Sequence, residues 1–211
     1  MPDTKLLIAT HNQGKVREYR SLLADLQLEV TYLDAEGITL DVKETGETFE
    51  ENAVMKAQVY AEASGLLTWA DDSGLEVDAL AGAPGVRSAR YGAPAARSDK
   101  DRWQLLLKRM APVPDDARAA RFQCVVALAT PQGAVRTTSG VCEGRIGRAP
   151  RGDHGFGYDP VFLVADTDFQ LTMAELQPDH KNRISHRGHA AQAAKQVLVE
   201  LIDSEKASSG W

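Results

Sequence analysis

Short apolar runs alternate with amphipathic helical patterns along most of the chain. Residues 5–10 form an apolar run, and the next positions place Val16, Tyr19 and Leu22 on one side of a helix. Residues 28–33 are rich in β-forming side chains and predict a second strand after that helix. Strand, helix and strand in this order predict a βαβ unit at the start of the chain.

A long helix is predicted next. Thr48 and Glu51 have the spacing of a capping box, and Gly65 follows the last turn of the apolar pattern. Lys56 lies beside the apolar stripe, where a lysine either reaches a phosphate or, more commonly, extends to solvent. Glu44 precedes the cap, in a loop from which a carboxylate reaches a neighbouring metal site or stays solvated.

Two adjacent carboxylates follow the next β-run. Residues 67–70 lead directly into Asp71, Asp72, Ser73 and Gly74. Neighbouring carboxylates at a strand end can share a divalent cation, or one can hold a metal while the other orients or deprotonates a water. The same residue types are common in turns that end strands, and the four residues alone favour that turn.

Further β-runs and helical patterns complete the chain. The β-runs cover residues 75–80, 121–130, 134–143 and 161–164, and the helical patterns cover residues 98–110 and begin at residues 172 and 185. Residues 131–133, Pro-Gln-Gly, indicate a hairpin between two of the strands. No internal repeat is evident. The pattern predicts one α/β domain over residues 1–203 and a flexible polar tail over residues 204–211.

Composition restricts the class of protein. Of the 211 residues, 43% are hydrophobic and 26% are charged, which is typical of a folded globular protein. The formal net charge of −6 argues against a general nucleic-acid binder or an anionic-membrane binder. Cys124 and Cys142 have no Cys or His at metal-ligand spacing, so we expect buried, reduced thiols. The first residues do not resemble a secretion signal, and no apolar run spans a bilayer, which predicts a cytoplasmic protein.

The loop after the first strand is a candidate phosphate site. Residues Thr10 to Lys15 connect a strand to a helix, where backbone N–H groups and the helix N-terminus attract anions, and Lys15 adds positive charge. The spacing of Gly14 and Lys15 is not that of a Walker loop. A plain strand-to-helix turn explains this stretch equally well.

A glycine-rich loop carries closely spaced aromatic residues. Residues 144–160 contain five glycines, and Phe156 and Tyr158 alternate with them. Glycines between aromatics permit turns that present ring faces, which suits stacking on a nucleobase. An ordered loop whose aromatic rings cover the core is the equally weighted alternative.

Positive charge collects where the last helix is expected to begin. Five basic side chains share this region: Lys181, Arg183, His186, Arg187 and His189. The dipole at a helix N-terminus disfavours positive charge, so an anionic or acceptor-rich ligand would stabilise the arrangement. The sequence therefore favours a binding site at this position.

Five stretches, in chain order, together resemble the inosine/xanthosine triphosphate pyrophosphatase family. They are Thr10 to Lys15, Glu44 to Gly46 with Asn52-Ala53 and Lys56-Ala57, Ala70 to Leu75, Phe156 to Pro160, and Ser185 to Gly188. The resemblance implies a mixed α/β fold with a long central β-sheet, flanking helices and two lobes with a cleft. It also implies a homodimer and a Mg²⁺-dependent hydrolysis of deaminated purine nucleoside triphosphates to monophosphate and pyrophosphate.

The resemblance also implies roles for individual residues. The triphosphate would be held by Thr10, His11, Asn12, Gln13, Gly14 and Lys15, assisted by Lys56. Magnesium would be bound by Glu44 and Asp72, with Asp72 also accepting the proton of the attacking water, Ser73 beside the substrate and Asp71 in support. The purine would stack on Phe156, its pocket would be completed by Gly157, Tyr158 and Asp159, and its edge would be read by Lys181, His186 and Arg187.

The last assignment agrees with the chemistry of the bases. Hypoxanthine and xanthine carry an O6 acceptor where adenine carries an amino donor, so cationic donors aimed at O6 reject adenine. Guanine shares O6, and its exclusion must depend on the 2-position. Two alternatives remain. A pyrophosphatase of the Maf type would prefer modified pyrimidine or methylated nucleotides, and a nucleotide sensor would bind without turnover, although it would not need the metal carboxylates.

Overall fold

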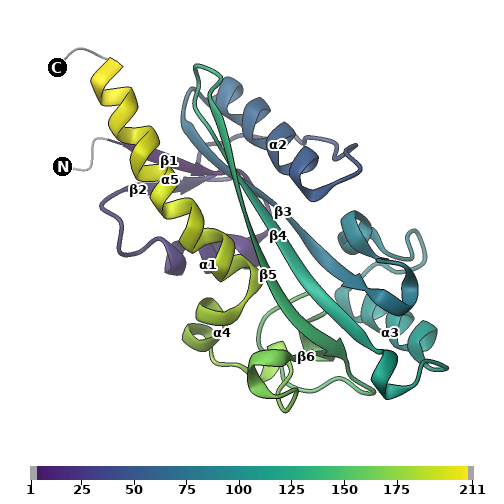
Figure 1. The fold of residues 1–211 in the computed structure, drawn as a ribbon. Helices are drawn as coiled ribbons and strands as arrows, with labels where there is room; N and C mark the ends of the chain where they lie inside the picture. The colour runs from purple at the N-terminus through teal and green to yellow at the C-terminus, as the bar shows by residue number, and fades with distance from the viewer. Residues whose placement is uncertain (1–3, 209–211) are drawn as a thin grey trace. The chain divides into compact units, whose positions relative to one another are not determined.

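A computed structural model describes residues 4–208 as a mixed α/β fold, and the predicted fold class is confirmed. Six strands form one sheet in the order β2-β1-β3-β4-β5-β6 (Figure 1). The strands are β1 Lys5–Ile8, β2 Glu29–Tyr32, β3 Leu67–Val77, β4 Ala119–Ala129, β5 Val135–Ile146 and β6 Phe162–Val164. The α-helices are α1 Gln13–Leu22, α2 Phe49–Ser64, α3 Asp99–Met110, α4 Pro178–Ile184 and α5 His186–Ser208.

The chain divides into two compact units, and the three longest strands pass from one to the other. Among the described residues, the first unit comprises residues 4–72, 125–139 and 189–208. The second unit comprises residues 73–124 and 140–188. The boundary in β3 falls between Asp72 and Ser73, so the two halves of the central acidic stretch belong to different units.

The first unit begins with the predicted βαβ arrangement, which is confirmed. Strand β1 is parallel to both β2 and β3. Helix α1 connects β1 to β2 and buries Val16 and Tyr19, and Tyr19 packs edge-on against Trp69 of β3 with ring centroids 5.3 Å apart. The apolar spacing seen in the sequence therefore fixes which side of α1 faces the sheet.

Helix α2 has the predicted ends. The Thr48 hydroxyl accepts a hydrogen bond from the backbone of Glu51, and the Glu51 side chain accepts one from the backbone of Thr48, which completes the capping box. Gly65 ends the helix with a φ of 67°, a left-handed conformation that favours glycine. Between these ends the helix buries Ala53, Ala57 and Tyr60.

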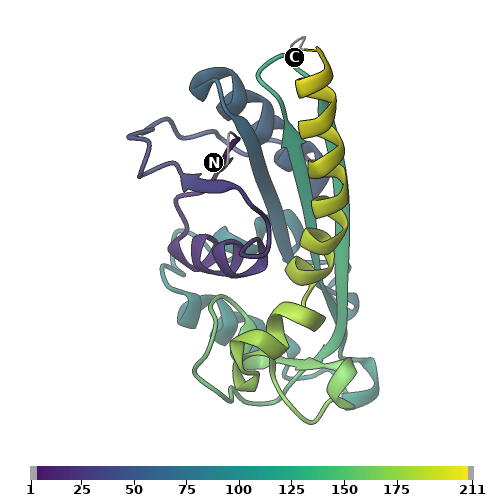
Figure 2. The ribbon, with the colours of Figure 1, turned by 90° about the vertical axis from the view of Figure 1, so that its left-hand side faces the viewer.

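Helix α5 is longer than expected and its apolar stripe is slightly rotated. Ala190, Ala194 and Leu198 are buried, whereas Ala193, which the helical spacing predicts on the same stripe, is exposed. The Thr138 hydroxyl of β5 donates to the Ala190 carbonyl, and Figure 2 shows α5 running beside the long strands. The helix continues to Ser208, into the segment expected to be a flexible tail. Residues 209–211 lie outside the described range, and the flexibility stays a prediction.

Strand β3 corrects the interpretation of the acidic stretch. The sequence favoured a turn at Asp71 to Gly74, but β3 continues through these residues from Leu67 to Val77. The short strand β1 pairs with β3 only as far as Ile8 opposite Trp69. Polar side chains are tolerated in this buried strand because charged partners from neighbouring helices contact them, as described below.

The second unit is built around an apolar cluster. Its residues come from α3 and from the parts of β3, β4 and β5 that belong to this unit. Its largest members include Leu106, Met110, Phe122 and Phe162, all buried. Phe122 and Phe162 pack with ring centroids 4.5 Å apart. The predicted helix over residues 98–110 is confirmed, with Ser98 as its N-cap.

The two cysteines are buried free thiols, as expected. Burial raises the pKa of Cys142 to about 12, so its thiol stays protonated and unreactive near neutral pH. Among the described residues, no helix has the length and apolar character needed to cross a membrane.

The capping box makes a prediction about stability. Replacing Thr48 with Ala removes the acceptor for the Glu51 N–H group and should lower the free energy of unfolding by about 1 kcal/mol. Replacement by Ser keeps the hydroxyl and should restore most of the loss. Urea denaturation of the three proteins measures the effect, and equal stabilities of the Ala and Ser variants would contradict it.

Candidate active site

The register of the parallel strands brings the phosphate loop and the carboxylates together. Ile8 pairs with Trp69, and the backbone N–H of Ala9 donates to the Trp69 carbonyl at 2.8 Å. Thr10 and Asp71 each lie two residues beyond that pair, at the carboxyl end of β1, where its parallel pairing with β3 stops although β3 itself continues. Ligand sites in open α/β sheets form at this edge.

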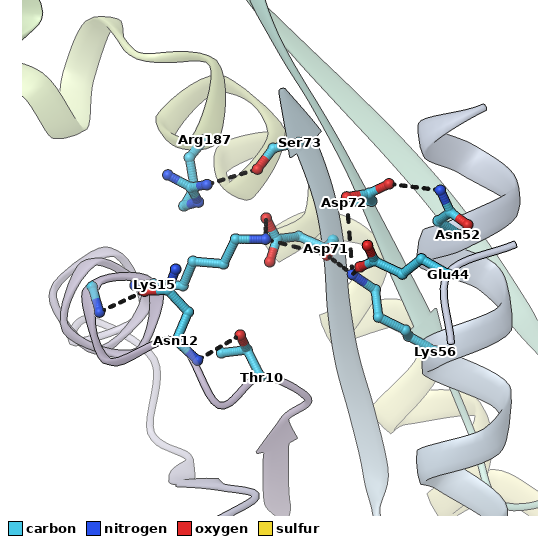
Figure 3. A network of polar contacts seen from close by, with 11 residues as sticks. Thr10, Asn12, Lys15, Glu44, Asn52, Lys56, Asp71, Asp72, Ser73 and Arg187 are labelled. Carbon is cyan, nitrogen blue, oxygen red and sulfur yellow. Dashed lines mark hydrogen bonds and ion pairs between the residues drawn. The ribbon is translucent and has the colours of Figure 1, made fainter. Parts of the chain in front are cut away.

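Lys15 is held by Asp71. Its ammonium group lies 3.0 Å from the Asp71 carboxylate and 3.5 Å from the Asp71 carbonyl oxygen (Figure 3). Both side chains are largely buried, with 14% of Lys15 and 1% of Asp71 exposed. The lysine of the candidate phosphate loop is thus fixed in direction by a carboxylate on β3.

Lys56 connects the other carboxylates. Its ammonium group donates to Glu44 at 2.6 Å and to the Asp71 carbonyl oxygen at 2.7 Å, and lies 4.0 Å from Asp72. The expectation that Lys56 more commonly extends to solvent is wrong, because the side chain is 11% exposed. Burial lowers the pKa of Lys56, but the three carboxylates outweigh that effect and raise the pKa above its ordinary value.

Asp72 has a different set of partners. The Asn52 amide donates to one of its carboxylate oxygens at 3.0 Å. Burial raises the pKa of the Asp72 carboxyl above its usual value, and Lys56 and Lys15 oppose that rise. Asn52 also accepts a hydrogen bond from the backbone of Gly46 at 2.8 Å, which ties the loop containing Glu44 to α2.

The two adjacent aspartates point in opposite directions. Successive side chains of a strand alternate between its faces. Asp71 contacts Lys15 of α1, and Asp72 contacts Asn52 of α2, and Figure 3 shows these helices on opposite sides of β3. The first option raised by the sequence, two neighbouring side chains that share one cation, is therefore wrong. Asp71 and Asp72 serve separate partners.

The phosphate loop also differs from expectation. The Asn12 side chain accepts hydrogen bonds from the backbones of Gly14 and Lys15 at 2.8 and 3.2 Å, so it caps α1 and occupies N–H groups expected to face a phosphate. The backbone of Asn12 itself donates to the Thr10 hydroxyl at 3.1 Å. Side chains are therefore the loop's main candidates for phosphate contact, above all the Lys15 ammonium and the Asn12 amide nitrogen.

The carboxylate set fits magnesium. Glu44 and Asp72 reach the Lys56 ammonium from a loop and from β3, so they already surround a positive charge. Three carboxylates face two lysines here, which leaves a net negative charge. Among residues 4–208, no group of three or more His, Cys, Asp or Glu could hold a metal by itself. Magnesium is commonly bound by one or two carboxylates with waters and substrate phosphates, which matches this donor set.

The second unit holds the residues expected to recognise a base. Asp159 is buried and accepts hydrogen bonds from the backbone of Phe156 at 2.9 Å and from Lys181 at 2.7 Å. Lys181 lies 5.1 Å from the centre of the Phe156 ring, and the Arg187 guanidinium lies 5.4 Å from it. Phe156, Lys181 and Arg187 are therefore neighbours, as the sequence interpretation required.

Other predicted base contacts make internal contacts. The Tyr158 hydroxyl donates to the Ser88 carbonyl at 2.8 Å, and the Tyr158 ring is buried. His186 is buried and stacks on Phe122, with ring centroids 4.7 Å apart. Tyr158 thus covers the core, as one interpretation of the glycine-rich loop expected, whereas Phe156 is only partly buried and its stacking on a base stays a prediction.

Part of the positive charge near the start of α5 is explained by a separate helix, α4. Helix α4, which the sequence pattern did not predict, places Lys181 and Arg183 in its last turn, where a helix dipole favours positive charge. His186 and Arg187 begin α5, and Arg187 donates to the Ser73 hydroxyl at 2.8 Å. Of these cations, only those of α5 lie near a helix N-terminus, where the dipole disfavours positive charge.

Two supporting residues received no role in the sequence analysis. Asn52 reaches Asp72, and the signal for it was a polar pair, Asn52 and Lys56, spaced four residues apart within an apolar helix stripe. Asp99 at the start of α3 accepts a hydrogen bond from the backbone of Gly157 at 2.8 Å and so positions the aromatic loop. No local pattern predicts that contact, since 58 residues separate the partners.

The buried cluster makes a pH-dependent prediction. Replacing Lys56 with Met leaves buried carboxylates without their cation and should lower the free energy of unfolding by about 3 kcal/mol at pH 8. Asp72 has a raised pKa that rises further without Lys56, so lowering the pH to 5 should favour protonation of Asp72 and reduce the loss. Urea denaturation at both values tests this. Lys195 pairs with the exposed Asp25, so Lys195→Met is the control and should cost less than about 1 kcal/mol.

Known proteins resemble this chain over almost its full length. The sequence profile of the Ham1 family matches residues 6–197. A protein of Symbiobacterium thermophilum named dITP/XTP pyrophosphatase is 47% identical over 203 residues, covering 96% of this chain and 99% of that protein. A Bacillus subtilis protein of the same name is 45% identical over 192 residues, covering 91% and 96%.

Solved structures show the same fold. A HAM1 protein from Coxiella burnetii has a TM-score of 0.83 and 42% identity, covering 93% of this chain and 99% of that one. A nucleoside-triphosphatase / dITP/XTP pyrophosphatase from Mycobacterium abscessus has a TM-score of 0.72 and 40% identity, covering 90% and 98%. The resemblance inferred from five short stretches is confirmed over most of the sequence. The chain therefore belongs to the Ham1 family.

Proposed function

We propose that this protein hydrolyses deaminated purine nucleoside triphosphates, such as dITP, ITP and XTP, to the monophosphate and pyrophosphate. The observation that carries the proposal is the cluster of carboxylates and lysines around β3. In this cluster Lys15 pairs with Asp71, and Lys56 pairs with Glu44 and lies near Asp72. The names of the relatives at 45–47% identity support the choice of substrate and reaction.

The first unit supplies the groups for phosphate chemistry. Lys15 and the Asn12 amide are the donors for the triphosphate, with Thr10 supporting the loop backbone. Asp71 keeps Lys15 directed at the edge of the sheet. A positioned cation of this kind stabilises charge on a departing pyrophosphate, since phosphoryl transfer depends mainly on positioning and electrostatics.

Asp72 is the proposed proton acceptor. Water attacks the α-phosphorus, the bond to the bridging oxygen of the leaving pyrophosphate breaks, and the water proton passes to the Asp72 carboxylate. Asn52 fixes the direction of that carboxylate by its hydrogen bond at 3.0 Å. Asp71 points toward α1 and is assigned to Lys15 rather than to the water.

Glu44 and Asp72 are the proposed ligands for magnesium. One oxygen of Asp72 cannot both hold the ion tightly and take the proton, so the two tasks fall to its two different carboxylate oxygens. When bound, the ion supplies Lewis-acid neutralisation of phosphate charge. Lys56 keeps the two carboxylates oriented, and as a buried cation it offsets their charge. Lys56 is thus a positioning residue in this proposal, and not a direct phosphate contact.

The second unit supplies the groups for base recognition. Phe156 presents an aromatic face, and Lys181 and Arg187 lie beside it as donors suited to the O6 acceptor of hypoxanthine and xanthine. Asp159 and Asp99 hold the loop through the backbones of Phe156 and Gly157. The cytoplasmic location and the homodimer implied by the family resemblance stay predictions, and light scattering of the purified protein tests the second.

A substrate panel tests the activity. Pyrophosphate release should be rapid with dITP, ITP and XTP and nearly absent with ATP, because Lys181 and Arg187 are matched to an O6 acceptor that adenine lacks. GTP, which shares O6, should also be nearly inert, in agreement with the names of the relatives. Addition of EDTA should abolish release, and Mg²⁺ should restore it. Release of phosphate instead of pyrophosphate would contradict attack at the α-phosphorus. Preference for modified pyrimidine nucleotides would favour the Maf-type alternative. Absence of hydrolysis with every nucleotide of the panel would favour a nucleotide sensor.

The two aspartates should be separable by kinetics. Asp72→Asn keeps the shape of the side chain but removes the proton acceptor, and should lower kcat by roughly 10²- to 10⁴-fold with triphosphate binding retained. Asp71→Asn releases Lys15 and should raise KM as well as lower kcat. Stopped-flow turnover and equilibrium binding of dITP distinguish the effects. Equal losses of kcat with unchanged KM in both variants would refute the division of roles.

A further inference from the structure

Asp34 holds two side chains of the phosphate loop at once. It follows β2 in the turn at residues 33–37, and each of its carboxylate oxygens has a different partner. One oxygen lies 2.6 Å from Nδ1 of His11, and the other accepts a hydrogen bond from the Gln13 amide at 2.9 Å. Its partners are 23 and 21 residues away in the sequence, on both sides of Asn12.

The contacts of His11 favour its protonated form. Its second ring nitrogen, Nε2, lies 3.5 Å from the Leu40 carbonyl oxygen, which also accepts the Tyr60 hydroxyl at 2.9 Å. Both ring nitrogens of His11 thus face acceptors, a carboxylate and a carbonyl. A neutral imidazole has one N–H group and an imidazolium has two, so only the charged ring donates to both.

The charged groups around His11 agree with that state. The hydrogen bond that His11 donates to Asp34 raises the pKa of His11, partial burial lowers it, and the Leu40 carbonyl and the Asp41 carboxylate raise it further. The nearest lysine of the same loop, Lys15, is itself paired with Asp71. Negative groups from the segment after β2 therefore surround the ring of His11.

Stability is a weak explanation for this arrangement. The side chains of His11 and Asp34 are 41% and 47% exposed. Exposed ion pairs contribute little to folding because solvent screens them and side-chain freedom is lost. A carboxylate beside an anion-binding loop would also repel phosphate unless its charge were balanced, and the imidazolium of His11 provides that balance.

We propose that Asp34 is a positioning residue for the triphosphate: it clamps His11 and Gln13, keeps His11 as an imidazolium, and so maintains positive charge and a fixed shape in the loop that binds phosphates. This inference rests on the proposed function in that it takes residues 10–15 to be the triphosphate loop. It adds a dependence on pH, since loss of the His11 proton breaks the contact with Leu40 and leaves Asp34 unbalanced beside the phosphates.

The test uses the full chain and inorganic tripolyphosphate as the probe, at constant Mg²⁺ concentration. Calorimetric titration of the wild type and of His11→Gln should show binding about two- to fivefold tighter for the wild type at pH 6. The difference should shrink at pH 8.5, because a higher pH favours loss of the His11 proton. Tripolyphosphate also changes its protonation with pH, but this affects both proteins equally. The ratio of the two affinities at each pH therefore reports only the contribution of His11.

Asp34→Asn tests the clamp. The amide removes the carboxylate that favours the imidazolium, so the NMR titration of the His11 ring should move to lower pH, with the signal assigned from its loss in His11→Gln. Tripolyphosphate affinity should then fall at a lower pH than in the wild type. Asp25→Asn is the matched control, because Asp25 is an exposed aspartate that pairs with Lys195 of α5. This substitution should change neither the His11 titration nor the pH dependence of tripolyphosphate affinity.

The outcomes are distinct from those of the substrate panel. An unchanged His11 titration in Asp34→Asn, or an affinity ratio that does not vary with pH, overturns this inference even if dITP is hydrolysed. Conversely, absence of pyrophosphate release with the predicted pH effect on tripolyphosphate binding would overturn the proposed reaction and leave the role of Asp34 standing.

Discussion

The compensation of buried negative charge on β3 is the constraint on which the first unit depends. A strand that runs through two consecutive aspartates can be buried only if each carboxylate has a positively charged or hydrogen-bonding partner. Lys15 supplies that partner from α1, and Lys56 and Asn52 supply it from α2. The helices are therefore fixed to the strand by electrostatics as well as by apolar packing, and the same contacts aim the reactive groups.

This arrangement gives each aspartate its own surroundings. Alternation along a strand sends Asp71 to one helix and Asp72 to the other, so two residues of identical type and adjacent position acquire different neighbours. One carboxylate restrains a lysine, and the other is held by an amide near a second carboxylate. Enzymes commonly obtain distinct roles from like groups in this way, by changing what each is packed against.

Several contacts recur as clamps on loops that carry candidate binding residues. Asn12 caps α1 from within the phosphate loop, and Asp34 holds the neighbours of Asn12 from the turn after β2. Asp159 and Asp99 hold the backbone beside Phe156 in the same manner. In each case a short acidic or amide side chain accepts hydrogen bonds from a loop, which reduces the conformational entropy that a ligand would otherwise have to remove.

The sequence by itself determined the elements whose signals are local. The capping box of Thr48 and Glu51, the left-handed Gly65 and the apolar spacing of α1 are set by contacts within four or five residues, and each was predicted correctly. Only the tertiary structure decided that β3 continues through Asp71, that Lys56 turns inward and that Asp34 reaches His11. Those outcomes depend on partners tens of residues away, whose proximity follows from strand register and helix packing, so no local pattern contains them.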